Sequence, residues 1–171
     1  MGKVERILQL IIVLGAAALL AVFWDATRDR VVRVGDTAPD FSITTSNNLT
    51  VSRANFGGRV LILNFWATWC PPCVEEMPAL ERLSRQLRDS GVVVFGISVD
   101  KNEQKYRNFV RRFNLTFPTA HDPAGRVSGL YGTYKYPETY VINSKGKVVQ
   151  KIIGQIDWTD ESVINFLRSV T

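Results

Sequence analysis

The chain has 171 residues, of which 46% are hydrophobic and 22% are charged, and its formal net charge is +5. This length suits a single domain and this composition is normal for a globular fold. The basic residues form no dense stripe of lysine and arginine, and Arg111-Arg112 is only a pair, so nucleic-acid binding is not expected.

The first predicted element is an apolar helix over residues 7–24, "ILQLIIVLGAAALLAVFW", which carries no charge. About 18 such residues nearly cross a hydrocarbon core of about 30 Å. Trp24 lies at the end, where an aromatic ring suits the headgroup region. We interpret the segment as a transmembrane signal anchor that follows a short tail, residues 1–6. The alternatives are a signal peptide cleaved near Ala16-Ala17-Ala18 and a buried helix of a soluble protein.

The orientation of this anchor is not decided by charge, because basic residues flank both of its ends: Lys3, Arg6, Arg28, Arg30 and Arg33. The short N-terminal tail is typical of signal anchors that send the following domain across the membrane. We therefore expect a single-pass protein of the cell membrane with an extracytoplasmic C-terminal domain, on the periplasmic or outer face, where disulfide chemistry is permitted.

Residues 25–37, "DATRDRVVRVGDT", are polar and basic without a clear period. We predict a tether, which at about 3.3 Å per residue reaches at most roughly 40 Å. The domain that follows, residues 38–171, and its partners are then expected near the membrane surface.

Two continuous apolar runs, residues 60–66 and 92–99, indicate buried strands of that domain. Between them, residues 72–90 carry apolar side chains at spacings of three and four, which predicts an amphipathic helix that ends at Gly91. After the second run, Asp100 is expected to cap a helix.

The remaining elements are shorter. They are an edge strand at 41–45, a turn at 55–59, a helix at 125–131, a hairpin at 137–154 and a final helix that opens at 157–159. In the helix that Asp100 caps, Glu103 is the expected capping-box partner. The order strand, helix, strand, helix, hairpin, helix predicts an α/β fold, a mixed sheet with helices on both faces.

The only two cysteines, Cys70 and Cys73, lie at the start of the first domain helix, directly after a buried strand. Residues three apart share a helix face, so their sulfurs can meet. A helix N-terminus stabilises a thiolate. Cys70, at the exposed first position, is the expected nucleophile, and Cys73 is the expected resolving thiol.

Two other uses of the pair are weighed against redox chemistry. A structural disulfide across so short a loop constrains the unfolded chain very little. A structural zinc site needs four ligands, and the chain offers two cysteines and one histidine. That histidine, His121, is expected to be an ordinary surface residue, and no metal site is predicted.

The stretch "NFWATWCPPC" followed by "EEMP" resembles the thioredoxin superfamily and, within it, the membrane-anchored TlpA/ResA/CcmG-type thiol–disulfide oxidoreductases. The resemblance runs from about Gly35 to the C-terminus. It implies a thioredoxin-like fold and an enzyme whose own cysteine pair serves in place of a cofactor. It also implies that Tyr136-Pro137 is a cis peptide bond that faces the cysteines.

Glu76 matches a glutamate that this branch carries three residues past its second cysteine. Thioredoxin has a buried aspartate where this chain has Asn64, and an amide cannot accept the proton. A partly buried carboxyl group one turn from Cys73 has a raised pKa and can pass a proton to or from a thiol. The alternative for Glu76 is a solvated helix residue, as expected for Glu75.

Pro71 and Pro72 have no N–H group, so Cys73 N–H is the nearest donor to the Cys70 sulfur. A less stabilised thiolate favours the oxidised pair, and we expect the domain to donate electrons.

The residues expected around the cysteines are mostly aromatic. Trp69, Tyr136 and Pro137 are expected to bind substrate. Trp66 suits either the core or the surroundings of Cys70, and Trp158 is expected to pack against the last helix.

The resemblance implies a protein-disulfide reductase whose substrate is a disulfide-containing protein such as apocytochrome c during cytochrome c maturation, recharged by a transmembrane thiol electron donor. Two alternatives remain. A thiol peroxidase needs a P-x-x-x-T-x-x-C pattern that the chain lacks. A copper chaperone of the Sco kind uses C-x-x-x-C, one residue longer than the spacing here, and a downstream histidine.

Overall fold

The computed structural model describes residues 2–27 and 31–171, which belong to two compact units divided after Arg30. The first unit is the helix α1 (Lys3–Thr27). Its segment Val4–Trp24 has a mean hydropathy of 2.6 and no buried part, so it is long and apolar enough to cross a membrane. The helix extends beyond the predicted 7–24 at both ends. Residues 28–30 of the predicted tether, with Arg28 and Arg30, lie outside the described residues.

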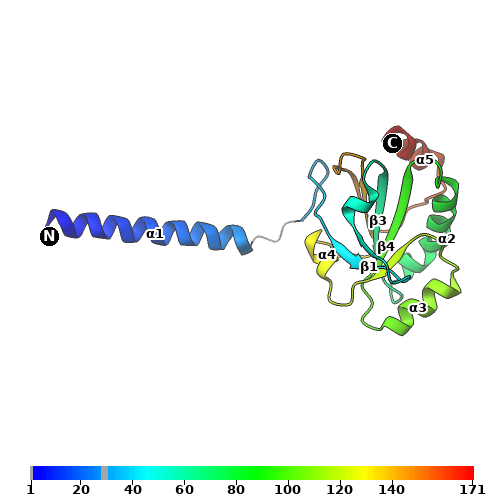
Figure 1. Ribbon diagram of the computed structural model, residues 1–171, viewed down its shortest axis with the longest axis horizontal. Helices are drawn as coiled ribbons and strands as arrows, with labels where there is room; N and C mark the ends of the chain where they lie inside the picture. Colours follow the sequence, from blue (N-terminus) through cyan, green and yellow to red (C-terminus); the bar gives the residue numbers. More distant parts are fainter. Residues whose placement is uncertain (1, 28–30) are drawn as a thin grey trace. The chain divides into compact units, whose positions relative to one another are not determined.

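The second unit is built on a five-stranded mixed sheet in the order β5-β4-β3-β6-β7. Its neighbouring strands β3 and β4 are labelled in Figure 1. The strands are β3 (Val60–Trp66), β4 (Val92–Ser98), β5 (Thr119–His121), β6 (Glu138–Ile142) and β7 (Val148–Ile153). β4 runs parallel to β3 and β5, whereas β6 is antiparallel to β3 and β7 is antiparallel to β6. Every residue of β3 is buried, as expected of a central strand.

Helices cover both faces of this sheet, as predicted. On one face lie α2 (Pro71–Gln86), α3 (Glu103–Arg112) and α5 (Glu161–Ser169), and on the other lie α4 (Arg126–Leu130) and the short 3-10 helix η1 (Arg53–Phe56). Since α2 and α3 each connect neighbouring parallel strands in the same direction, right-handed crossovers place them on the same face.

Each face has its own hydrophobic core. Trp66 is fully buried in the core under α2, α3 and α5, which decides between its two predicted places. Gly96 in β4 allows this packing, because a Cβ there would lie 3.0 Å from Phe117 Cε2 and 3.1 Å from Trp66 Nε1. The opposite core is rich in rings: Phe41, Phe56, Phe65, Phe95, Tyr131 and Tyr140.

The folded unit begins before residue 38, so the tether prediction for 25–37 was too long. Val32 is buried, and its carbonyl accepts a hydrogen bond of 3.2 Å from Lys151 Nζ. Gly35 N–H donates to Val148 O at 2.8 Å, and Val148 N–H donates to Asp36 O at 3.0 Å. The segment is held mainly by backbone hydrogen bonds, which its polar side chains do not reveal.

Three predictions about individual elements are also corrected. The strand β1 (Ser42–Thr44) pairs with β2 (Thr50–Ser52) in a separate two-stranded sheet instead of forming an edge of the main one. The N-cap of α3 is Asn102, whose side chain accepts from Lys105 N–H at 3.0 Å. The N-cap of α5 is Asp160, so this helix begins after the predicted 157–159.

Candidate active site

Cys70 and Cys73 form a disulfide bond at the N-terminus of α2. The S–S distance is 2.14 Å and the Cα–Cα distance is 5.3 Å. Cys70 is the N-cap residue, placed there because the buried strand β3 ends four residues earlier. The exposed fraction is 5% for Cys70 and 0% for Cys73, so Cys70 is the more accessible of the two residues. It is nevertheless buried, whereas the sequence predicted an exposed cysteine. The surrounding core covers both.

The first turn of α2 offers the Cys70 sulfur one observed donor. Pro71 and Pro72 occupy the first two helical positions and have no N–H. Cys73 N–H donates to Cys70 Sγ at 3.3 Å. A helix start that normally presents several free amides therefore presents few to this sulfur.

Glu76 lies one turn further along α2, and 4% of it is exposed. Its Oε1 accepts from Asn64 Nδ2 at 2.9 Å and its Oε2 accepts from Trp158 Nε1 at 3.1 Å. Burial raises the pKa of this carboxyl group from 4.5 to about 7, although the bonds from Trp158, Asn64 and the Ile156 amide oppose the rise. The alternative of a solvated helix residue is wrong for Glu76, whereas Glu75 is exposed.

Asn64 connects Glu76 to the strand that follows the cis bond. Its Nδ2 also donates to Thr139 Oγ1 at 2.9 Å, because the antiparallel register pairs Asn64 of β3 with Thr139 of β6. Asn64 Oδ1 is buried and has no hydrogen-bond partner among the described residues. The amide thus donates to its neighbours, as a carboxylate in its place could not.

The residues predicted to bind substrate meet at the same end of the sheet. Tyr136-Pro137 is a cis peptide bond, as the resemblance implied. The register pairs Phe65 with Glu138, which brings Pro137 beside the end of β3 that leads to Cys70. The rings of Trp69 and Tyr136 meet edge to face with centroids 5.9 Å apart, and Trp69 is 62% exposed.

Two residues near the site were not predicted to belong to it. Trp158 is buried and holds Glu76, although its sequence position suggested packing alone. Asp100, predicted as a helix cap, accepts from Thr68 N–H at 3.0 Å and from Thr68 Oγ1 at 2.6 Å, and so fixes the loop before Cys70. Both contacts join residues that are distant in the chain, and no local pattern indicates them.

His121 has a structural environment. Its Nε2 lies 2.6 Å from Asp100 O and its ring stacks on Tyr106. It is half-buried instead of lying freely on the surface. Among the residues that the structure describes, no group of three or more His, Cys, Asp or Glu side chains is arranged to hold a metal ion.

Comparison with known proteins identifies a family and several similar oxidoreductases. The model of the AhpC/TSA family matches residues 34–151. The thiol–disulfide oxidoreductase ResA of Bacillus thuringiensis subsp. konkukian is 31% identical over 166 residues, which cover 97% of this chain and 95% of that protein. The thioredoxin-like protein YneN of Bacillus subtilis is 40% identical over 123 residues, 71% of each chain.

A solved structure from Chlorobium tepidum, described as a DsbE thiol:disulfide interchange protein, superposes with a TM-score of 0.76 at 27% sequence identity. The similarity covers 81% of this chain and 98% of that one. The shared fold is the thioredoxin-like α/β fold predicted from the sequence.

Proposed function

Because the chain belongs to the AhpC/TSA family of thioredoxin-like proteins and is a thiol–disulfide oxidoreductase of the ResA kind, we propose that it reduces disulfide bonds of partner proteins outside the cytoplasm. The observation that carries the proposal is the Cys70–Cys73 pair at the start of α2, with the buried carboxyl group of Glu76 one turn behind it. Enzymes of this kind use their own cysteine pair and no external cofactor.

The reaction begins with the reduced pair. The Cys70 thiolate attacks one sulfur of the partner disulfide, the partner S–S bond breaks, and one partner thiolate leaves. Cys73 then gives its proton to the Glu76 carboxylate and attacks Cys70 Sγ. This step releases the second partner thiolate and forms the Cys70–Cys73 disulfide. Two electrons have passed to the partner, and the disulfide in the structure is the oxidised product.

Recharging runs the same steps in reverse. One thiolate of a dithiol donor attacks Cys70 Sγ, the Cys70–Cys73 bond breaks, and Glu76 gives a proton to the leaving Cys73 thiolate. The second donor thiol then breaks the mixed disulfide, which releases the Cys70 thiolate and leaves the donor oxidised. A pKa of about 7 suits both directions, because the carboxyl group is then partly protonated near neutral pH. We propose a transmembrane thiol protein as the donor.

The partner surface in this proposal is formed by Trp69, Tyr136 and Pro137. The exposed ring of Trp69 lies against Tyr136 and provides apolar contact area beside the cysteines. An extended segment of the partner would add backbone hydrogen bonds next to Pro137. Apocytochrome c, whose C-x-x-C-H cysteines must be reduced before haem attachment, is the substrate we propose.

The proposed location rests on α1, an apolar N-terminal helix that fits a signal anchor. A domain tethered there acts close to the membrane. In cells, the full chain should remain in the membrane fraction after an alkaline wash, and protease added from outside should digest the C-terminal domain. A protected domain would contradict the proposed orientation.

The decisive experiment traps the partner. Cys73→Ser should accumulate a mixed disulfide through Cys70, because no thiol remains to resolve it, and mass spectrometry of the captured complex identifies the protein. Cys70→Ser is the matched control and should trap little. Equal trapping by the two variants would contradict the assigned roles.

Assays of the purified protein test the two alternative functions. Rapid peroxide consumption would favour a thiol peroxidase, and stoichiometric bound copper would favour a Sco-like chaperone.

A further inference from the structure

We propose that Trp158 is a positioning residue for Glu76: its indole N–H holds the carboxyl group in place and sets the pH at which that group ionises. The consequence for catalysis rests on the proposed proton transfer between Glu76 and Cys73. The contact itself does not depend on that role.

Trp158 comes from a distant part of the chain. It lies in the loop between β7 and α5, 82 residues after Glu76, and only 1% of it is exposed. Its Nε1 donates to Glu76 Oε2, and Asn64 Nδ2 donates to the other oxygen. Each carboxyl oxygen therefore has its own donor, which fixes both the position and the rotation of the group.

The groups around this carboxyl are neutral. The strand β3 contributes Asn64, and the loop before α5 contributes Trp158 and the Ile156 amide. None of these partners carries a charge that would compensate a buried carboxylate. The carboxylate therefore depends on a few neutral hydrogen bonds, and the loss of one should raise the pKa of Glu76 further. A hydrogen bond to an ionised group is worth about one to two pKa units.

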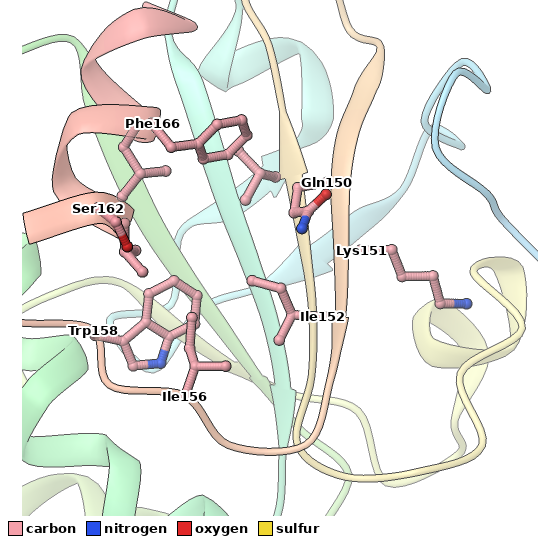
Figure 2. A pocket seen from close by; sticks show the side chains of 10 residues that line it. Gln150, Lys151, Ile152, Ile156, Trp158, Ser162 and Phe166 are labelled. Carbon is pink, nitrogen blue, oxygen red and sulfur yellow. The ribbon is translucent and has the colours of Figure 1, made fainter. Parts of the chain in front are cut away.

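The rest of the indole has a packing role, which determines the choice of variant. Trp158 and Ile156 line a cavity of about 400 Å³ together with Ile152 of β7 and Phe166 of α5 (Figure 2). Replacing Trp158 by alanine would enlarge this cavity and disturb the core. Phenylalanine keeps an aromatic ring there and removes the N–H donor.

The experiment follows the Glu76 carboxyl carbon by NMR in the oxidised full-length chain in detergent micelles. In Trp158→Phe the midpoint of its titration should rise by about one pH unit above the wild-type midpoint. Trp66→Phe is the matched control, because Trp66 is equally buried in the same core and its Nε1 has no hydrogen-bond partner among the described residues. An unchanged midpoint in Trp158→Phe would overturn the proposal.

A second measurement needs no substitution of Trp158. In the wild-type chain its indole N–H resonance should shift with pH at the same midpoint as the Glu76 carboxyl carbon, and Glu76→Gln should abolish that shift. A resonance that stays constant through the titration of Glu76 would refute the contact even if Trp158→Phe fails to fold.

The pH profile of Cys73 alkylation in the reduced protein separates this inference from the proposed function. If Glu76 exchanges a proton with Cys73, the profile should move in Trp158→Phe together with the Glu76 midpoint. A moved midpoint with an unmoved alkylation profile would support the role of Trp158 and contradict the proton transfer.

Discussion

Glu76 places a carboxyl group where water cannot solvate it. The folded protein offers it three neutral donors, and burial still raises its pKa from 4.5 to about 7. The folded chain therefore holds this proton more tightly than the unfolded chain does. Stability from this group is greatest below pH 4.5 and is lost as the pH rises through 7.

Glu76→Gln should remove this pH dependence, because the amide does not ionise. The free energy of unfolding of the variant relative to wild type should improve by about 3 kcal/mol between pH 4.5 and pH 8. Urea denaturation of the oxidised proteins at the two pH values measures the difference. Glu75→Gln, at the exposed neighbouring position, is the matched control. A constant difference between Glu76→Gln and wild type would mean that Glu76 ionises normally.

The same substitution should change the reactivity of the reduced protein. Without a carboxyl group near Cys73, the pH dependence of thiol alkylation should differ from that of wild type. Superimposable curves for the two proteins would refute the role of Glu76 in proton transfer.

The start of the helix α2 determines how many backbone amides can stabilise a Cys70 thiolate. An N-cap side chain usually accepts from the amide of the second or third helical residue. Pro72 removes the second donor, and Cys73 N–H supplies the third at 3.3 Å from Cys70 Sγ. The helix therefore stabilises a Cys70 thiolate less than a proline-free helix would.

Pro72→Ala should restore the missing donor and stabilise the reduced form. A gain of about 1.4 kcal/mol corresponds to a reduction potential about 30 mV higher. Pro71→Ala should also raise the potential but by less, because the first helical amide is not the usual capping donor. Equilibration with glutathione measures the reduction potentials of the wild type and of the two variants. A lower or unchanged potential in Pro72→Ala would refute the argument that the prolines favour the oxidised pair.

At the level of the whole chain, the folded domain begins earlier than residue 38. Val32 and Ala38 are buried in the domain, and backbone hydrogen bonds join residues 35–38 to 146–148. The segment from residue 31 onward is thus part of the fold that carries the site.

A truncated chain of residues 31–171 should fold and keep its redox activity, whereas residues 39–171 should be destabilised. The loss should be at least about 3 kcal/mol, from the burial of Val32 and the missing backbone hydrogen bonds. Thermal unfolding followed by circular dichroism compares the two fragments. Equal stability would show that residues 31–38 contribute nothing to the domain.

Local patterns in the sequence were sufficient to predict the apolar helix, the order of the main elements, the mixed sheet and the cysteine pair at a helix start. Hydrophobic period, glycines and prolines act within a few residues, so they indicate the type and order of the elements, and the mixed sheet was inferred from that order. The cis bond at Tyr136-Pro137 was predicted from the resemblance, and the structure has it.

The surroundings of the cysteines depend on contacts between distant residues. Trp158 meets Glu76 across 82 residues, Asp100 meets Thr68 across 32, and Val32 meets Lys151 across 119. The near-complete burial of Cys70 likewise results from packing that the motif does not encode. Hydrogen bonds and burial of this kind form when the sheet register brings separate segments together, so a single stretch of sequence carries no trace of them.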